Sequence, residues 1–294
     1  MPTAHWVATM PARDHAWTKA LLDELQGIAV VWQGEWFQIT DTAIDRVDDC
    51  PAQAVGGEFP GWNSVRASRQ VGLAAAQSGR NDARDAVRDG MKDLLHGADP
   101  EREFLRVQDW LATLTPTARL DVADEALRWL VAWRSIAPAV SAECFVTSGY
   151  VRCSITEHVA LRINVDLLLR EPGSADRTAF VSIGGPPDRE RDEAAAARVA
   201  VAMWLRRQSI GAVVVAHPTS RSTQRFEITR ELVEFGATQF RSALRTLTRH
   251  RAGLEQAPPV AGPQCHWCEL RSECVEGRVY LAANPHTPGG LPIP

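Results

Sequence analysis

The sequence Cys265-His-Trp-Cys268-Glu-Leu-Arg-Ser-Glu-Cys274 brings three of the chain's six cysteines into one short segment. Two residues separate the first pair and five separate the second. A tight turn therefore points two thiolates at one ion or cluster, and the third follows after about one helical turn. Zinc and iron–sulfur clusters both commonly take four protein ligands. The segment predicts a metal site that needs a fourth ligand, and the residue types leave open an iron–sulfur cluster, a zinc ion or thiols without metal.

A second element lies early in the chain, in Ile39-Thr-Asp-Thr-Ala-Ile-Asp-Arg-Val-Asp-Asp-Cys50-Pro51. A short helix that ends in Cys-Pro, followed much later by a Pro/Gly linker and Cys-x2-Cys-x5-Cys, resembles the iron–sulfur branch of the RecB-type PD-(D/E)XK nuclease family. The resemblance implies that a 4Fe–4S cluster, with zinc as the alternative, is held by Cys50, Cys265, Cys268 and Cys274. Such a site would join two distant segments across a long loop and remove much unfolded-state entropy.

The middle of the chain is similar to the same family in the order of its elements. We expect a meander of strands at residues 143–150, 151–156, 159–169 and 178–183, followed by an Ala-rich helix, Arg189–Gln208. Glu143 opens the first strand, and Asp166 lies where the family has its metal-binding aspartate. Over residues 40–276 the resemblance implies an α/β (α+β) fold. It would be a PD-(D/E)XK restriction-endonuclease-like mixed sheet flanked by helices, with a helical N-terminal insertion.

The residues that cleave DNA in this family are missing where they are expected. The family places an acidic residue and a lysine two positions apart on the strand after that of Asp166, where they hold Mg²⁺ or Mn²⁺ and position water. This chain has Val181 and Ile183 in one frame, and Phe180 and Ser182 in the other. No lysine follows Lys92. Asp166 and Glu143 are therefore weak catalytic candidates, and Mg²⁺ or Mn²⁺ is expected only if activity remains.

Proline and glycine clusters suggest the domain organisation. We expect an N-terminal extension at residues 1–38, a PD-(D/E)XK-like domain at 39–281 and a disordered tail at 282–294. The domain would include a helical part at 64–133 and the iron–sulfur motif at 265–274. Apolar spacing also predicts helices at 12–26, 40–49 and 229–254, and apolar runs predict strands at 28–32, 210–217 and 226–228.

A basic stripe lies on the last long helix. Arg241, Arg245 and Arg249 recur every four residues and so share one face. The stripe suits contact with nucleic-acid phosphates, but it also suits a solvated face near a helix C-terminus. The net charge of -4 gives no global support for nucleic-acid binding. DNA and a protein are both candidate partners.

The composition is that of an ordinary globular protein, with 45% hydrophobic and 23% charged residues. No run approaches the roughly 18 apolar residues that span a membrane, and the first residues lack the apolar core of a secretory signal, so we expect a cytoplasmic protein without a membrane partner. The leading hypothesis is a catalytically degenerate iron–sulfur nuclease-like protein that binds DNA or a protein. The alternatives are an active metal-dependent deoxyribonuclease with relocated ligands, and a redox- or iron-responsive regulator.

Overall fold

The computed structural model describes residues 15–56, 105, 108–109, 112, 144–145, 149–170, 176–183, 187–217, 220, 222–266 and 268–285. The chain divides into two compact units. Unit 1 combines residues 1–18, 66–151 and 163–236, and unit 2 combines residues 19–65, 152–162 and 237–294. Each unit draws on segments that are far apart in the sequence, so each depends on long-range pairing.

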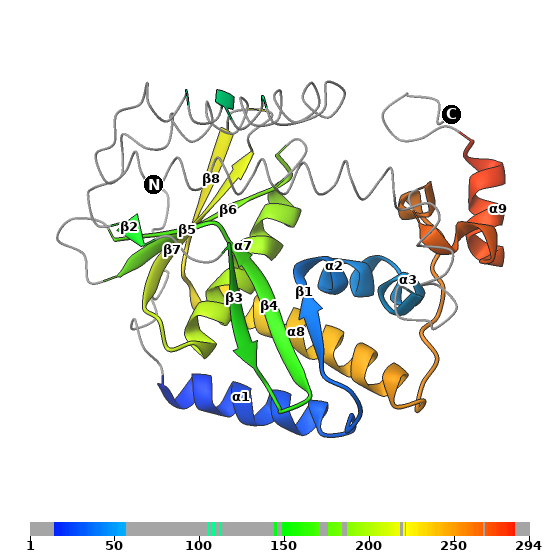
Figure 1. Ribbon diagram of the computed structural model, residues 1–294, viewed down its shortest axis with the longest axis horizontal. Coiled ribbons are helices and arrows are strands. Elements are labelled where there is room, and N and C mark those ends of the chain that lie inside the picture. The colour runs from blue at the N-terminus through cyan, green and yellow to red at the C-terminus, as the bar shows by residue number, and fades with distance from the viewer. Residues whose placement is uncertain are drawn as a thin grey trace, which may run out of the picture. The chain divides into compact units, whose positions relative to one another are not determined.

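The described part of the chain is a mixed α/β protein (Figure 1). Its α-helices are α1 His15–Ala29, α2 Asp41–Asp49, α3 Pro51–Gly56, α7 Arg189–Leu205, α8 Arg230–Arg251 and α9 Val275–Ala283. Two short 3-10 helices are η2 Pro263–His266 and η3 Glu269–Ser272. The strands are β1 Phe37–Thr40, β2 Cys144–Phe145, β3 Gly149–Ser154, β4 Val159–Val165, β5 Leu167–Arg170, β6 Arg177–Ser182, β7 Ile210–His217 and β8 Ser222–Glu227. Within these ranges, no helix has the length and apolar character to cross a bilayer.

Unit 1 contains a five-stranded sheet with the order β2-β5-β6-β7-β8. β6 and β7 run parallel, and the other neighbours run antiparallel. α7 connects β6 to β7 and packs on both, as a parallel pair requires. Every residue of β7 except Gly211 is buried, which is typical of a strand covered on both faces. The mixed α/β class expected from the sequence is therefore confirmed.

The second sheet has the order β1-β4-β3. β1 runs parallel to β4, with Phe37 opposite Val159 and Ile39 opposite Leu161, and these four side chains are buried. β4 ends at Val165 and β5 begins at Leu167, so the chain passes from one sheet to the other at Asp166. The single strand expected at residues 159–169 is therefore two strands in different sheets.

The short helix before Cys50 is confirmed as α2. The Thr40 hydroxyl accepts a hydrogen bond from the Ala43 backbone N–H at 3.3 Å, which satisfies one of the free donors of the first turn. Ile44 and Val47 form the buried face. The backbone turns extended at Cys50, and α3 then begins at Pro51, where proline suits the first helical position.

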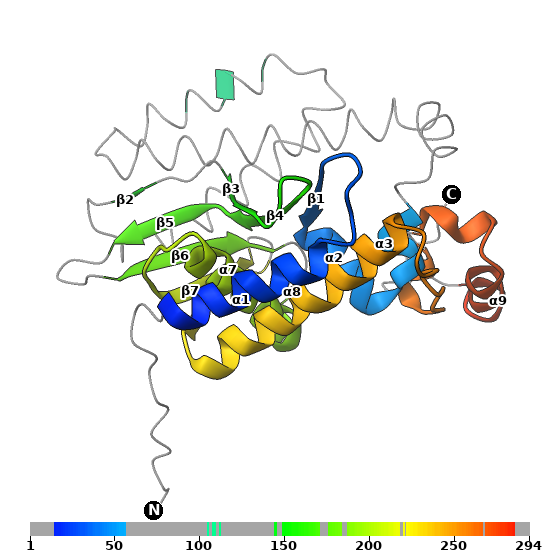
Figure 2. The same cartoon turned by 90° about the horizontal axis from the view of Figure 1, so that it is seen from below.

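α8 passes close to α7 at Gly236 in unit 1. A Cβ on Gly236 would lie 2.4 Å from the Ala197 carbonyl oxygen, so a larger residue cannot fit without moving a helix. Within unit 2, α8 also lies beside α1 (Figure 2). There the Arg241 guanidinium binds the Glu24 carboxylate at 2.9 Å.

Several sequence expectations are wrong. No strand forms at residues 28–32: residues 28 and 29 end α1, where Leu21, Leu25 and Ala29 recur every four residues on one buried face, and a turn follows. α9 reaches Ala283, so the expected disordered tail starts with two helical residues. Residues 286–294 lie outside the described part of the chain. The expected helical part at 64–133 does too, apart from residues 105, 108, 109 and 112, which are helical.

Candidate metal centre

The four predicted ligands lie at the ends of short elements in unit 2. Cys50 is the C-cap of α2, where its backbone N–H still bonds the Arg46 carbonyl at 2.8 Å. Cys265 lies within η2, Cys268 precedes η3, and Cys274 is the N-cap of α9. Cap residues lie just outside the regular helix, so their side chains can point to a common centre.

The structure brings the four thiols together. Burial raises the pKa of the Cys268 thiol above its ordinary value, a hydrogen bond from the Leu270 backbone lowers it, and the neighbouring sulfurs of Cys50, Cys265 and Cys274 raise it further. A Cβ on Gly277 would lie 3.6 Å from the Cys274 sulfur and 3.7 Å from the Cys265 sulfur. Gly277 therefore lies next to two of the four thiols.

Backbone amides point at the sulfurs. The Val260 N–H donates to the Cys50 sulfur at 3.3 Å, the Gly262 N–H to the Cys265 sulfur at 3.5 Å, and the Gly277 N–H to the Cys274 sulfur at 3.3 Å. Donors in these positions stabilise negative charge on sulfur, and hydrogen bonds of this kind are among the features that tune iron–sulfur sites. These donors suit thiolates better than neutral thiols.

Protein contacts hold the early and late segments together beside the sulfurs. The Gln264 side-chain amide donates to the carbonyls of Asp49 and Val260, both at 3.1 Å. The Ala52 N–H donates to the Pro258 carbonyl at 3.2 Å. The Pro/Gly linker therefore runs across the end of α2, and it places Cys50 beside the late cysteines.

Zinc and a cluster make different demands on this arrangement. Tetrahedral zinc at about 2.3 Å from each sulfur needs sulfurs about 3.8 Å apart. Within the described ranges, no three His, Cys, Asp or Glu side chains surround a single-ion position. A cluster binds each cysteine to a different iron and so takes sulfurs that are further apart. The described thiols are therefore not arranged around a single zinc position.

Asp166 lies at the end of the five-stranded sheet in unit 1. Its backbone N–H donates to the Phe180 carbonyl at 2.8 Å, and Leu167 pairs with Phe180 in the next position. The register of β5 on β6 continues no further than this pair. Neither β6, Arg177–Ser182, nor Ile183 after it supplies an acidic residue or a lysine near Asp166. Glu143 lies outside the described residues.

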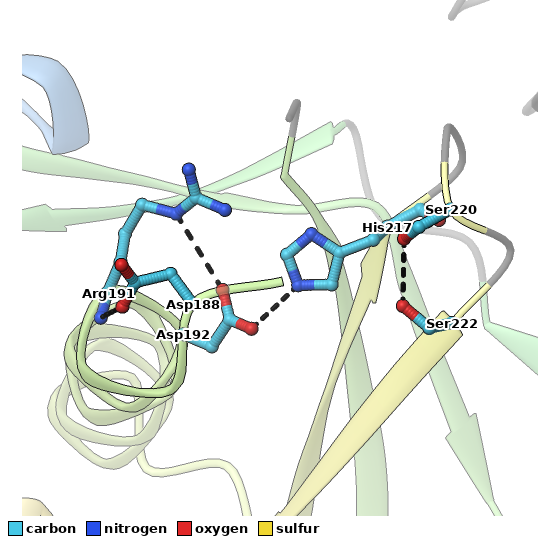
Figure 3. Close-up of polar contacts among 6 residues, drawn as sticks. All are labelled: Asp188, Arg191, Asp192, His217, Ser220 and Ser222. Carbon is cyan, nitrogen blue, oxygen red and sulfur yellow. Dashed lines mark hydrogen bonds and ion pairs between the residues drawn. The ribbon is translucent and has the colours of Figure 1, made fainter. Parts of the chain in front are cut away.

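A buried hydrogen-bonded pair in unit 1 joins Asp192 and His217. The His217 Nε2 lies 2.6 Å from the Asp192 carboxylate, and both side chains are fully buried (Figure 3). Asp192 lies in the first turn of α7, and His217 ends β7. The Arg191 Nε is 3.7 Å from the other Asp192 oxygen. The Asp192 carboxylate therefore binds His217 through one oxygen and lies near Arg191 through the other.

The basic stripe on α8 is partly neutralised. Arg241 binds Glu24, and the Arg249 Nε lies 2.6 Å from the Glu255 carboxylate. Arg245 is exposed. A patch that binds DNA phosphates needs charges that are free to replace counterions, so the pairing of Arg241 and Arg249 reduces what the stripe can contribute.

No protein-family model matches the chain. No curated protein matches it either. Among solved structures the chain is similar to the crystal structure of SSO0001, with 14% sequence identity and a TM-score of 0.36 over 89% of this chain and 97% of that one. A similarity at this level carries no argument about fold or function.

Proposed function

We propose that the protein is a four-cysteine iron–sulfur protein of the PD-(D/E)XK nuclease-like class, with a degenerate hydrolytic site, which acts by binding DNA or a protein. The observation that carries this proposal is the meeting of Cys50 with Cys265, Cys268 and Cys274. Segments about 210 residues apart contribute to one thiol-lined centre. When bound, a 4Fe–4S cluster supplies Fe–S bonds that link these segments.

The surroundings of the cysteines support a resident cluster. Cys50, Cys265 and Cys268 are buried, and all four sulfurs accept or approach a backbone hydrogen bond. Gly277 lies next to two of them, Cys265 and Cys274. Buried thiols without metal need no such set of donors, because a neutral thiol is a weak acceptor.

The nuclease-like class and the loss of hydrolysis are supported by the sheet in unit 1. The antiparallel β5–β6 pair, the α7 crossover and the parallel β7 follow the order that the resemblance implies. Hydrolysis would require a second carboxylate near Asp166, and the neighbouring strand β6 has no acidic residue and no lysine. A single carboxylate among apolar side chains holds Mg²⁺ weakly, because this ion needs several oxygen ligands.

Hydrolysis is tested with iron-loaded protein, Mg²⁺ or Mn²⁺, and single- and double-stranded DNA. We expect no cleavage above that of an Asp166→Ala variant with the same iron content. Cleavage by the wild type that this variant loses would overturn the assignment of a degenerate site.

The partner is tested by DNA binding at two salt concentrations, with Arg245→Ala beside wild type. Binding that weakens with salt and in the variant supports DNA as the partner. If the protein shows no such DNA binding, a protein partner is supported.

A further inference from the structure

We propose that Cys274 is the exchangeable ligand of the four-cysteine site, whereas Cys50, Cys265 and Cys268 form its fixed part. The inference rests on the proposed iron–sulfur function and concerns the regulation of that same site. Small molecules from solvent, such as chelators or external ligands for iron, would displace Cys274 before the other three cysteines.

Burial separates Cys274 from the other three. Cys50, Cys265 and Cys268 are each at most 9% exposed, while Cys274 is only half-buried. Val275 and Val279 on the following helix α9 are also open to solvent, at 59% and 65% exposed. A reagent that reaches the site from water therefore meets the Cys274 sulfur before the others.

The Pro/Gly linker also shields two of the buried cysteines, Cys50 and Cys265, from solvent. Val260 and Gly262 donate backbone hydrogen bonds to the sulfurs of Cys50 and Cys265. Gln264 anchors this linker to Asp49. Opening either sulfur to solvent requires these contacts to break, whereas Cys274 needs no movement of the linker.

A negative charge stands beside Cys274. The Cys274 thiol donates a hydrogen bond to the exposed Glu276 carboxylate at 3.5 Å. A thiolate that held iron could not make this bond and would carry the same charge as the carboxylate, so the contact would favour release of Cys274. The Gly277 N–H and the N-terminus of α9 stabilise negative charge on the same sulfur whether or not it is bound, so they do not decide which ligand leaves.

The test follows which cysteine becomes free as iron is withdrawn. Iron-loaded wild-type protein is held without oxygen, treated with a ferrous-iron chelator and iodoacetamide, and mapped by peptide mass spectrometry over time. We expect Cys274 to be alkylated several-fold faster than Cys50, Cys265 and Cys268. In Glu276→Gln, which keeps the shape and removes the charge, we expect slower alkylation of Cys274. Buried Cys153, outside the site, reports on general unfolding.

Iron retention gives a second measurement. Cys274→Ser should keep more than half of the wild-type iron, and Cys265→Ser should lose nearly all of it. Simultaneous alkylation of all four cysteines, first alkylation of a buried one, or equal iron loss in both variants would overturn the inference. Wild-type protein that binds no iron at all would instead overturn the proposed function, and this outcome is visible before any labelling.

Discussion

The backbone amide of Val260 donates a hydrogen bond to the sulfur of Cys50 at 3.3 Å, and the two residues are 210 positions apart. This contact places an early cysteine under the linker that leads to the late three. The same linker reaches Asp49 through Gln264. The two segments are therefore joined by the protein itself, and metal binding would strengthen a junction that already exists.

Removing the metal should destabilise unit 2. A cross-link that closes a loop of this length removes unfolded-state entropy worth on the order of 5 kcal/mol. We expect a chelator to lower the unfolding temperature of the iron-loaded wild type by many degrees. The measurement is thermal unfolding by circular dichroism under nitrogen, with and without chelator. An unchanged transition would show that the junction gains no stability from metal.

Asp192→Ala should cost about 3–5 kcal/mol of unfolding free energy, because it leaves the fully buried His217 without its partner. The measurement is urea unfolding at neutral pH. The matched control is Glu193→Ala, an exposed neighbour on the same turn of α7, for which we expect a change below about 0.5 kcal/mol. Equal effects in the two variants would mean that the pair contributes nothing specific.

Gly236→Ala should destabilise unit 1 by about 1–3 kcal/mol, since its Cβ would meet the Ala197 carbonyl oxygen at 2.4 Å. Gly27→Ala is the matched control within α1, because nothing lies within 4 Å of its Cβ position. There we expect a gain of up to about 1 kcal/mol from helix propensity. Chemical unfolding of the two variants checks both signs, and a stable Gly236→Ala protein would contradict the close approach of the helices.

Thr40→Ala should weaken the start of α2 by about 1 kcal/mol, because the Ala43 N–H loses its acceptor. Since α2 ends at Cys50, iron retention during dilution should fall along with stability. Thr42→Ala, at an exposed position of the same helix, is the control. If both variants keep stability and iron alike, the cap has no part in presenting Cys50.

Local patterns predicted much of this structure. The helix that ends at Cys50, the alanine-rich α7 and the strand β7 follow from periodicity and from residue preferences that act within a few positions. The meeting of Cys50 with Cys265 was expected from family resemblance, since spacing alone could not supply a partner so far away.

Other features depend on tertiary contacts that spacing does not reveal. The Asp192–His217 pair spans 25 positions, and Asp192 stands in the charged first turn of α7, where the sequence gives no sign of a buried partner. The end of β4 before Asp166 was missed because apolar residues continue on both sides of it. The change of sheet there depends on which strands pair with β4 and β5, which the local sequence does not show. Likewise, the spacing of Arg241 and Arg249 gave no hint of Glu24 and Glu255 as their partners.

The central claim is that one metal centre unites the early cysteine with the late three. Its most direct test is iron, acid-labile sulfide and zinc analysis, with an absorption spectrum, on anaerobically purified wild type, Cys50→Ala and the control Cys153→Ala. The account predicts about four irons and four sulfides per chain in wild type and control, and their loss in Cys50→Ala. Stoichiometric zinc, or iron that Cys50→Ala retains in full, would contradict it.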